Sequence, residues 1–278
     1  MSGFVAGPLV ERVNSSMDSH DDMKGTNELA ASFLEPRGRR ALLKGAAVGI
    51  SSLAAIGAGA MPALAADTKG GKGATYQEAI VGILTVARTA EQLAVTFYSN
   101  GIANADKLGL KDENLAYIKA ALVEEQIHQL LFTASGGKSL ATTFSFPKGQ
   151  QTFEDLKTFI ETQQQLEGVF DSAFLAAIKE FAMMGRPDLA QLSGQIACIE
   201  AEHRALGRAI GGLVPADNWA FTPVLLKSVA DAPALVKDAG YLSPVAGNSY
   251  TYQQVSIEDA GVEQRKPYTA DGMVMGKG

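Results

Sequence analysis

Two short stretches of the sequence place a glutamate and a histidine three residues apart. Glu125 and His128 lie in LVEEQIHQLL, and Glu200 and His203 lie in CIEAEHRALG. Both stretches are otherwise rich in small and apolar residues, as a packed helix would be. Residues three apart share one face of a helix, so each pair can direct a carboxylate and an imidazole at one centre. This combination of ligands suits iron or manganese, and zinc is also compatible with it.

Two further glutamates have a spacing that would bring them to the same centre. Glu91 lies 34 residues before the glutamate of the first Glu-x-x-His pair, and Glu167 lies 33 residues before that of the second. The midpoints of these intervals fall in a loop-like segment at 108–109 and beside the turn GRPD at 185–188. Two antiparallel hairpins that reverse there would place all four glutamates at one height.

Four carboxylates buried together are strongly unfavourable if they stay ionised without positive charge beside them. Two divalent cations would neutralise them, and two histidines would complete the set of ligands. We therefore predict a cofactor of two divalent metal ions, about 3–4 Å apart. The predicted metal ligands are Glu91, Glu125, His128, Glu167, Glu200 and His203.

The elements that must carry these side chains are helices. Hydrophobic residues recur with a period near 3.6 from residue 75 to residue 213, and no strand-like alternation appears there. Thr152 is the predicted N-cap of the third helix, and Pro187 can open the fourth at its first position. The predicted helices run from Tyr76 to beyond Tyr98, from Asp112 to Ala134, from near Thr152 to Met184, and from Pro187 to about Gly211.

The connection between the second and third helices, residues 135–150, is too long for a simple turn. Extended at about 3.3 Å per residue, it can span roughly 45–50 Å. A helix of about 23 residues is only about 35 Å long, so the connection can cross the whole bundle. We predict an all-α fold, a four-helix bundle with this long crossover. The GGKS in the crossover is not a phosphate-binding loop, because the loop's first glycine and its preceding strand are missing.

The order of one Glu, Glu-x-x-His, one Glu and Glu-x-x-His resembles the ferritin-like di-metal carboxylate superfamily. Within it, residues 75–213 are most similar to the exported ferritin-like domain proteins of bacteria, which are related to plant desiccation-associated proteins. The resemblance implies a four-helix bundle with a bridged pair of iron or manganese ions. It does not imply a single activity, because relatives oxidise iron, store it or disproportionate peroxide.

Our first functional hypothesis is a redox enzyme that acts on dioxygen or peroxide. Glu125 and Glu200 would bridge the metals as the catalytic residues, and Glu91 and Glu167 would be terminal ligands. The expected reaction is oxidation of iron(II) or removal of peroxide. The alternative is a non-catalytic metal-binding protein, or an envelope-stress interaction protein on the same scaffold. A homo-oligomer is compatible with either.

The first 65 residues have the pattern of an export signal. Arg39 and Arg40 precede a charge-free run at 45–64, and Ala63-Leu64-Ala65 offers a cleavage site. This resembles the twin-arginine signal of bacteria. We expect a disordered lead and signal peptide over 1–65, a linker over 66–74, and a location in the periplasm or cell envelope. A membrane anchor is the alternative for the apolar run, so contact with a membrane is expected only if the signal is not cleaved.

The net charge of −6 argues against a nucleic-acid partner. The single cysteine, Cys198, is expected to be a small buried residue, and no internal disulfide can form. Residues 214–278 are expected to form a C-terminal extension of irregular structure with one short helix broken at Pro233. We interpret the aromatic stripe of Phe159, Phe170 and Phe174 as ordinary core packing.

Several residues near the predicted ligands have two interpretations. Glu161 is an alternative to Glu167, which we prefer because it lies on the apolar stripe. Glu124 and Glu202 are either solvated charges or contacts to the ligands. Tyr98 lies seven residues after Glu91 on the same face, so it is either a plain core tyrosine, which we favour, or a phenol that bonds to the site.

Overall fold

The computed structural model describes residues 72–258 and 260–267. The expected lead and export signal at 1–65, and residues 66–71 of the expected linker, lie outside the described residues. The last three linker residues, 72–74, belong instead to the first helix of the bundle.

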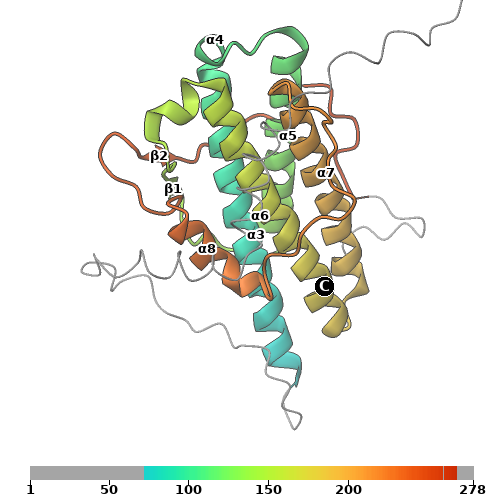
Figure 1. Ribbon diagram of the computed structural model, residues 1–278. Helices are drawn as coiled ribbons and strands as arrows, with labels where there is room; N and C mark the ends of the chain where they lie inside the picture. The colour runs from blue at the N-terminus through green and yellow to red at the C-terminus, as the bar shows by residue number, and fades with distance from the viewer. Residues whose placement is uncertain (1–71, 259, 268–278) are drawn as a thin grey trace, which may run out of the picture. The chain divides into compact units, whose positions relative to one another are not determined.

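The described residues form four long helices that run side by side (Figure 1): α3 (Lys72–Ala103), α5 (Asp112–Ala134), α6 (Leu156–Met183) and α7 (Pro187–Ile210). The predicted all-α bundle is therefore confirmed. Part of α3, Tyr76–Ala103, is long and apolar enough to cross a membrane, but 72% of its most apolar window is buried inside the protein. That burial is what a core helix of a bundle shows.

The bundle consists of two antiparallel hairpins. In the first, the short helix α4 (Ala105–Leu108) lies between α3 and α5. In the second, α6 reverses into α7 through a turn in which Gly185 has φ of 71°, a left-handed conformation that glycine adopts without strain. Pro187 opens α7, where a proline costs no hydrogen bond. Both reversals lie where the glutamate spacing placed them.

Helix α6 begins later than the sequence suggested. Thr152 is not its N-cap, because it lies buried in a 3₁₀ turn, η2 (Gly149–Phe153). Asp155 is the N-cap instead: its backbone is extended, and its carboxylate accepts a 2.8 Å hydrogen bond from the backbone N–H of Thr158. Both residue types cap well, so the turn before the helix decided between them.

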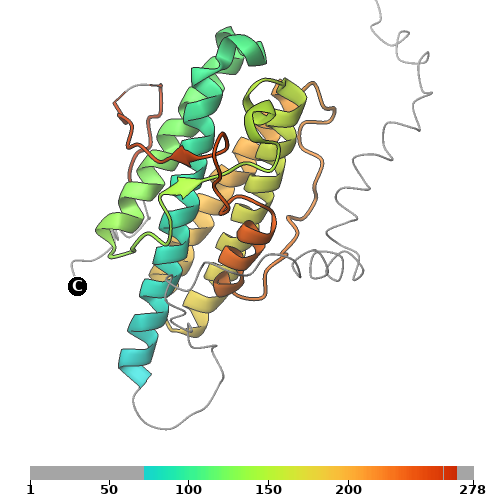
Figure 2. The ribbon, with the colours of Figure 1, turned by 90° about the vertical axis from the view of Figure 1, so that its left-hand side faces the viewer.

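Hydrogen bonds between side chains of α3 and backbone groups of the crossover hold the crossover along α3. Backbone N–H groups of Lys138 and Leu140 donate to the hydroxyls of Thr85 and Thr89, each at 3.0 Å. Arg88 donates to the carbonyl of Gly137 at 2.9 Å. Figure 2 shows the crossover running along the outside of α3, which returns the chain so that α6 runs in the same direction as α5.

The C-terminal extension packs on this crossover. Strand β2 (Tyr250–Thr251) pairs antiparallel with β1 (Thr143–Phe144) of the crossover, as Figure 2 shows. The extension also contains a 3₁₀ turn, η3 (Val229–Asp231), and the helix α8 (Ala232–Asp238). Pro233 lies in the first turn of α8, so the expectation that it breaks this helix was wrong. A proline is tolerated there because that N–H has no partner within the helix.

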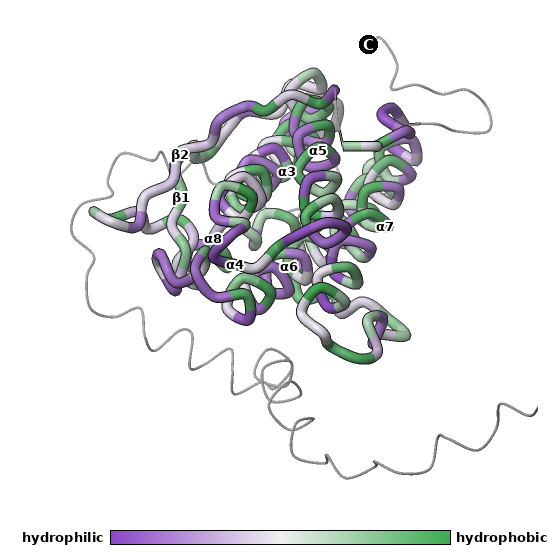
Figure 3. The backbone as a smooth tube through the Cα atoms, turned by 90° about the horizontal axis from the view of Figure 1, so that it is seen from above, coloured by the Kyte–Doolittle hydropathy of each residue, from purple (hydrophilic) through white to green (hydrophobic). Residues whose placement is uncertain are grey.

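The hydrophobic core lies between the four helices and between the helices and the crossover. Figure 3 shows hydrophobic and hydrophilic residues alternating around each helix. The stripe of Phe159, Phe170 and Phe174 is buried, as expected for core packing. Cys198, however, is exposed rather than buried. It lies two residues before Glu200, and two residues rotate the chain by about 200° around a helix, so an inward Glu200 turns Cys198 outward.

Two helical glycines test how closely the helices approach. A methyl group at Gly101 of α3 would lie 2.5 Å from the buried ring of Phe159, whereas one at Gly194 of α7 would lie 3.7 Å from Ile178. We expect Gly101→Ala to lower the free energy of unfolding by about 1–3 kcal/mol. Gly194→Ala should leave it unchanged or raise it by about 0.5–1 kcal/mol. Urea denaturation measures the free energy of unfolding of both variants. Equal effects of the two substitutions would contradict the close approach of α3 to Phe159 at Gly101.

Candidate metal centre

The structure brings all six predicted ligands together in the middle of the bundle. Glu91 comes from α3, Glu125 and His128 from α5, Glu167 from α6, and Glu200 and His203 from α7. Each of the glutamates is at most 1% exposed, His203 is 2% exposed, and His128 is 8% exposed. They form two groups of four residues, and within each group the possible ligand atoms lie within 4.8 Å of one another.

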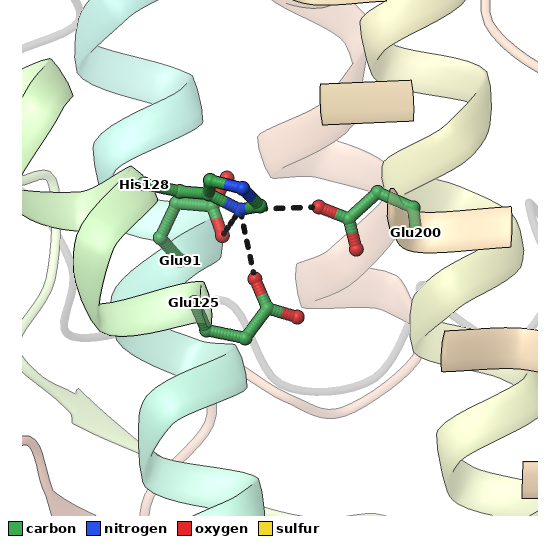
Figure 4. A group of neighbouring side chains, drawn as sticks. All are labelled: Glu91, Glu125, His128 and Glu200. Carbon is green, nitrogen blue, oxygen red and sulfur yellow. Dashed lines mark ion pairs between the residues drawn. The ribbon is translucent and has the colours of Figure 1, made fainter. Parts of the chain in front are cut away.

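The first group surrounds Nδ1 of His128 (Figure 4). This nitrogen lies 3.5 Å from Oε2 of Glu125, 3.8 Å from Oε1 of Glu200 and 3.9 Å from Oε2 of Glu91. Three helices, α3, α5 and α7, therefore supply one group.

The second group surrounds Nδ1 of His203. This nitrogen lies 3.2 Å from Oε1 of Glu125, 3.7 Å from Oε2 of Glu200 and 3.9 Å from Oε1 of Glu167. Here α6 takes the place of α3, and the arrangement otherwise repeats the first group.

Glu125 and Glu200 belong to both groups, and each divides its two oxygens between them. In Glu125, Oε2 faces His128 and Oε1 faces His203. In Glu200, Oε1 faces His128 and Oε2 faces His203. A carboxylate that presents one oxygen to each of two neighbouring positions has the geometry of a bridging ligand. Glu91 and Glu167 each serve a single position.

The polar atoms of this cluster lack the partners that buried polar atoms normally have. Fourteen buried side-chain atoms of the described residues have no hydrogen-bond partner, and nine of them belong to the two groups. These nine are both oxygens of Glu91, Glu125 and Glu200, Oε2 of Glu167, and Nδ1 of His128 and of His203. Carboxylate oxygens and imidazole nitrogens are ligands for iron, manganese and zinc, so two divalent cations fit the residues present.

The pKa values show how the cluster behaves without cations. Burial, and then repulsion from the neighbouring glutamates, raises the pKa of Glu91 and of Glu167 well above the usual range. Burial alone would also raise the pKa of Glu125, but its contacts with His128 and His203 lower it instead. Protons thus take up part of the charge that cations would neutralise. Metal binding must displace those protons, so affinity should rise with pH.

Several outer residues contact the cluster. Glu124 of α5 accepts a 2.8 Å hydrogen bond from Nε2 of His203, which leaves Nδ1 of that ring to face the centre. Tyr98 is fully buried, and its hydroxyl donates to Glu167. Gln163 donates to Tyr98 and to the carbonyl of His203. Glu124 therefore contacts the site, which is one of the two interpretations left open for it. For Tyr98 the favoured interpretation, a plain core tyrosine, was wrong, because its hydroxyl contacts the predicted ligand Glu167.

The competing acidic residues lie elsewhere. Glu161 is exposed and lies 3.9 Å from Lys157, so it does not take the place of Glu167. Glu202 is exposed as well. The sequence interpretation missed Asp171, which is 2% exposed, four residues after Glu167. Burial, and then repulsion from Glu200, raises the pKa of Asp171 to about 7. Its spacing from Glu167 is the signal that could have identified it.

The fold and the cluster define a helical-bundle protein whose core could hold divalent metal ions. Residues 79–212 match the family profile of the ferritin-like domain. These residues therefore form a ferritin-like domain. A comparison with curated proteins and a comparison with solved structures found no match.

The contact between Glu124 and His203 gives a test of the site. A carboxylate that holds the outer nitrogen of a ligating histidine typically contributes about 10–100-fold in metal affinity. We expect Glu124→Ala to weaken the binding of one of two manganese(II) ions by that factor in a calorimetric titration. Glu161→Ala, which removes an exposed carboxylate from α6, should change neither affinity. Equal affinities in wild type and Glu124→Ala would show that this contact does not position a ligand.

Proposed function

We propose that this protein binds two divalent metal ions, iron or manganese, and uses them to oxidise iron(II) or to remove peroxide. The observation that carries the proposal is the pair of four-residue groups that share Glu125 and Glu200. Helices α5 and α7 each supply one carboxylate that faces both groups, and ordinary core packing gives no reason for such an arrangement. It suits two neighbouring cations of total charge +4, and zinc is compatible with the same ligands.

The proposal gives each residue a role. Glu91 and His128 would hold one ion, Glu167 and His203 would hold the other, and Glu125 and Glu200 would contact both. A bound pair of redox-active ions would relay electrons from iron(II) to dioxygen, or from one peroxide molecule to another in disproportionation. Dioxygen or peroxide is therefore the proposed small-molecule partner.

The chain's own residues would prepare this site in two ways. Four helices bury the ligands almost completely, which excludes bulk water and strengthens every electrostatic interaction inside. Hydrogen bonds then fix the ligand atoms: Glu124 holds the proton on Nε2 of His203, and the hydroxyl of Tyr98 holds its proton toward Glu167. Both contacts orient a ligand and leave an atom of it available to a metal: Nδ1 of His203 and Oε2 of Glu167.

A second candidate is a metal-binding protein without turnover. The observation that favours it is the depth of the cluster, because five of its six residues are at most 2% exposed. Structural metal sites are typically closed, whereas catalytic sites keep a position open for substrate. In this case the two ions would stabilise the bundle, for example in an envelope-stress protein.

We also propose that the protein works outside the cytoplasm, in the periplasm or cell envelope. Arg39, Arg40 and the apolar run that follows support this location. The twin-arginine route carries folded proteins, so metal could be inserted before export. Cell fractionation tests the location: full-length protein found in the cytoplasm alone would contradict it.

Metal stoichiometry tests the binding itself. Purified protein should hold about two metal ions per chain by elemental analysis. Glu125→Ala combined with Glu200→Ala should abolish this binding, because both positions lose shared ligands. A matched control combines Glu113→Ala with Glu161→Ala, which removes two exposed glutamates from α5 and α6. A wild-type protein that is folded but holds no metal would refute the proposal.

Activity separates the two candidates. The enzyme proposal expects the loaded wild-type protein to oxidise iron(II) under air or to consume hydrogen peroxide, and the Glu125/Glu200 double variant to do neither. Stopped-flow absorbance and an oxygen electrode measure these reactions. If the protein binds two metals and performs neither reaction, the catalytic role fails and the structural candidate is favoured.

A further inference from the structure

A pocket of about 340 Å³, with four charged side chains in its lining, lies beside the metal centre, between α6, α7 and the start of the C-terminal extension. Its lining includes three carboxylates, those of Asp171, Glu202 and Asp217, and one guanidinium, that of Arg204. With all four groups ionised, the lining has a net charge of −2. The pocket is therefore attractive to cations.

Asp171 is the innermost of these carboxylates. It is 2% exposed, whereas Glu202 and Asp217 are both exposed. Its Oδ2 atom is buried and has no hydrogen-bond partner in the described part of the chain. A buried carboxylate oxygen without a partner is costly, so one that lines a pocket indicates a ligand that visits it.

The pocket lies directly beside the ligands. Asp171 follows Glu167 by one helical turn on the same face of α6. On α7, Ala201 follows Glu200 and forms part of the pocket wall. Besides burial, the charge of Glu200 acts on Asp171 and raises its pKa, and the charges of Arg204 and His203 act on it in the opposite direction. A cation at Asp171 would therefore already be within the field of the buried cluster.

Arg204 is held against the wall of the pocket. Its guanidinium lies 3.2 Å from the ring centroid of Trp219, and it donates a hydrogen bond to Asn218. No ion pair joins it to Asp171 within the described residues. Stacking on an aromatic ring stabilises a guanidinium without a carboxylate, although the buried Nε of Arg204 has no hydrogen-bond partner among the described residues. Arg204 therefore offsets one of the three negative charges, and its charge lowers the pKa of Asp171 without an ion pair between the two, which suits passage of a cation more than tight binding.

We propose that this pocket is the port through which divalent cations reach the buried centre, with Asp171 as the carboxylate that passes them on to Glu167 and Glu200. The inference rests on the proposed metal binding. Glu202 and Asp217 attract the cation at the exposed mouth, and Asp171 replaces part of its hydration shell before the final ligands do.

Loading kinetics test the port separately from the final site. Metal-free full-length protein is mixed with cobalt(II), and the visible absorption of the bound ion is followed by stopped flow. Asp171→Asn should slow loading by about tenfold, because it removes the charge that guides the ion inward. The final number of bound ions should stay at the wild-type value. Glu161→Gln removes the same charge from an exposed position on α6 and should load at the wild-type rate.

A second variant covers the case in which Asp171→Asn does not fold. Glu202→Gln combined with Asp217→Asn changes only exposed side chains and should also slow loading, with a weaker dependence on salt than wild type. Wild-type rates in every folded port variant would overturn the port and leave the metal centre intact. A wild-type chain that takes up no cobalt(II) would overturn the proposed function and the port together.

Discussion

Burial of four carboxylates at one height in a helical core is the constraint on which the rest of this structure depends. Helices normally turn such groups toward water, because a buried charge without a partner costs far more than a surface salt bridge returns. Here the oxygens of Glu91, Glu125, Glu167 and Glu200 converge instead, together with one nitrogen of each histidine. Burial and the neighbouring glutamates raise the pKa of Glu91 and of Glu167, so protons relieve some of this cost. Two cations between the shared carboxylates would relieve it fully.

The architecture serves this convergence. Two hairpins bring a Glu-x-x-His helix beside a helix with a single inward glutamate, and the crossover sets the direction of the second hairpin. Hydrogen bonds from the crossover to Thr85 and Thr89 hold it along α3, and β2 pairs with its strand β1. The extension also supplies Asp217 and Trp219 to the pocket beside α7. The part of the chain beyond the bundle thus adds groups next to the ligands.

Much of this fold could be predicted from the sequence, because the spacing of residues along each helix determines which of them share a face. The glutamate intervals located both reversals, and the Glu-x-x-His pairs identified residues that the structure brings together. Details that depend on tertiary contacts were less accessible. Asp155 rather than Thr152 caps α6 because a 3₁₀ turn buries Thr152 first. The contact of Glu124 with His203 joins two helices, so the spacing of residues within one helix could not predict it. Asp171 and the outward Cys198, by contrast, follow from helical geometry applied to Glu167 and Glu200.

The position of the metals is the most direct test of this account. Crystals of the full-length protein loaded with manganese(II) would give anomalous scattering peaks at any bound ion. The account predicts two neighbouring peaks between Glu125 and Glu200, one beside Nδ1 of His128 and the other beside Nδ1 of His203. Peaks only at the protein surface, or an ordered cluster with no peak at either histidine, would contradict it.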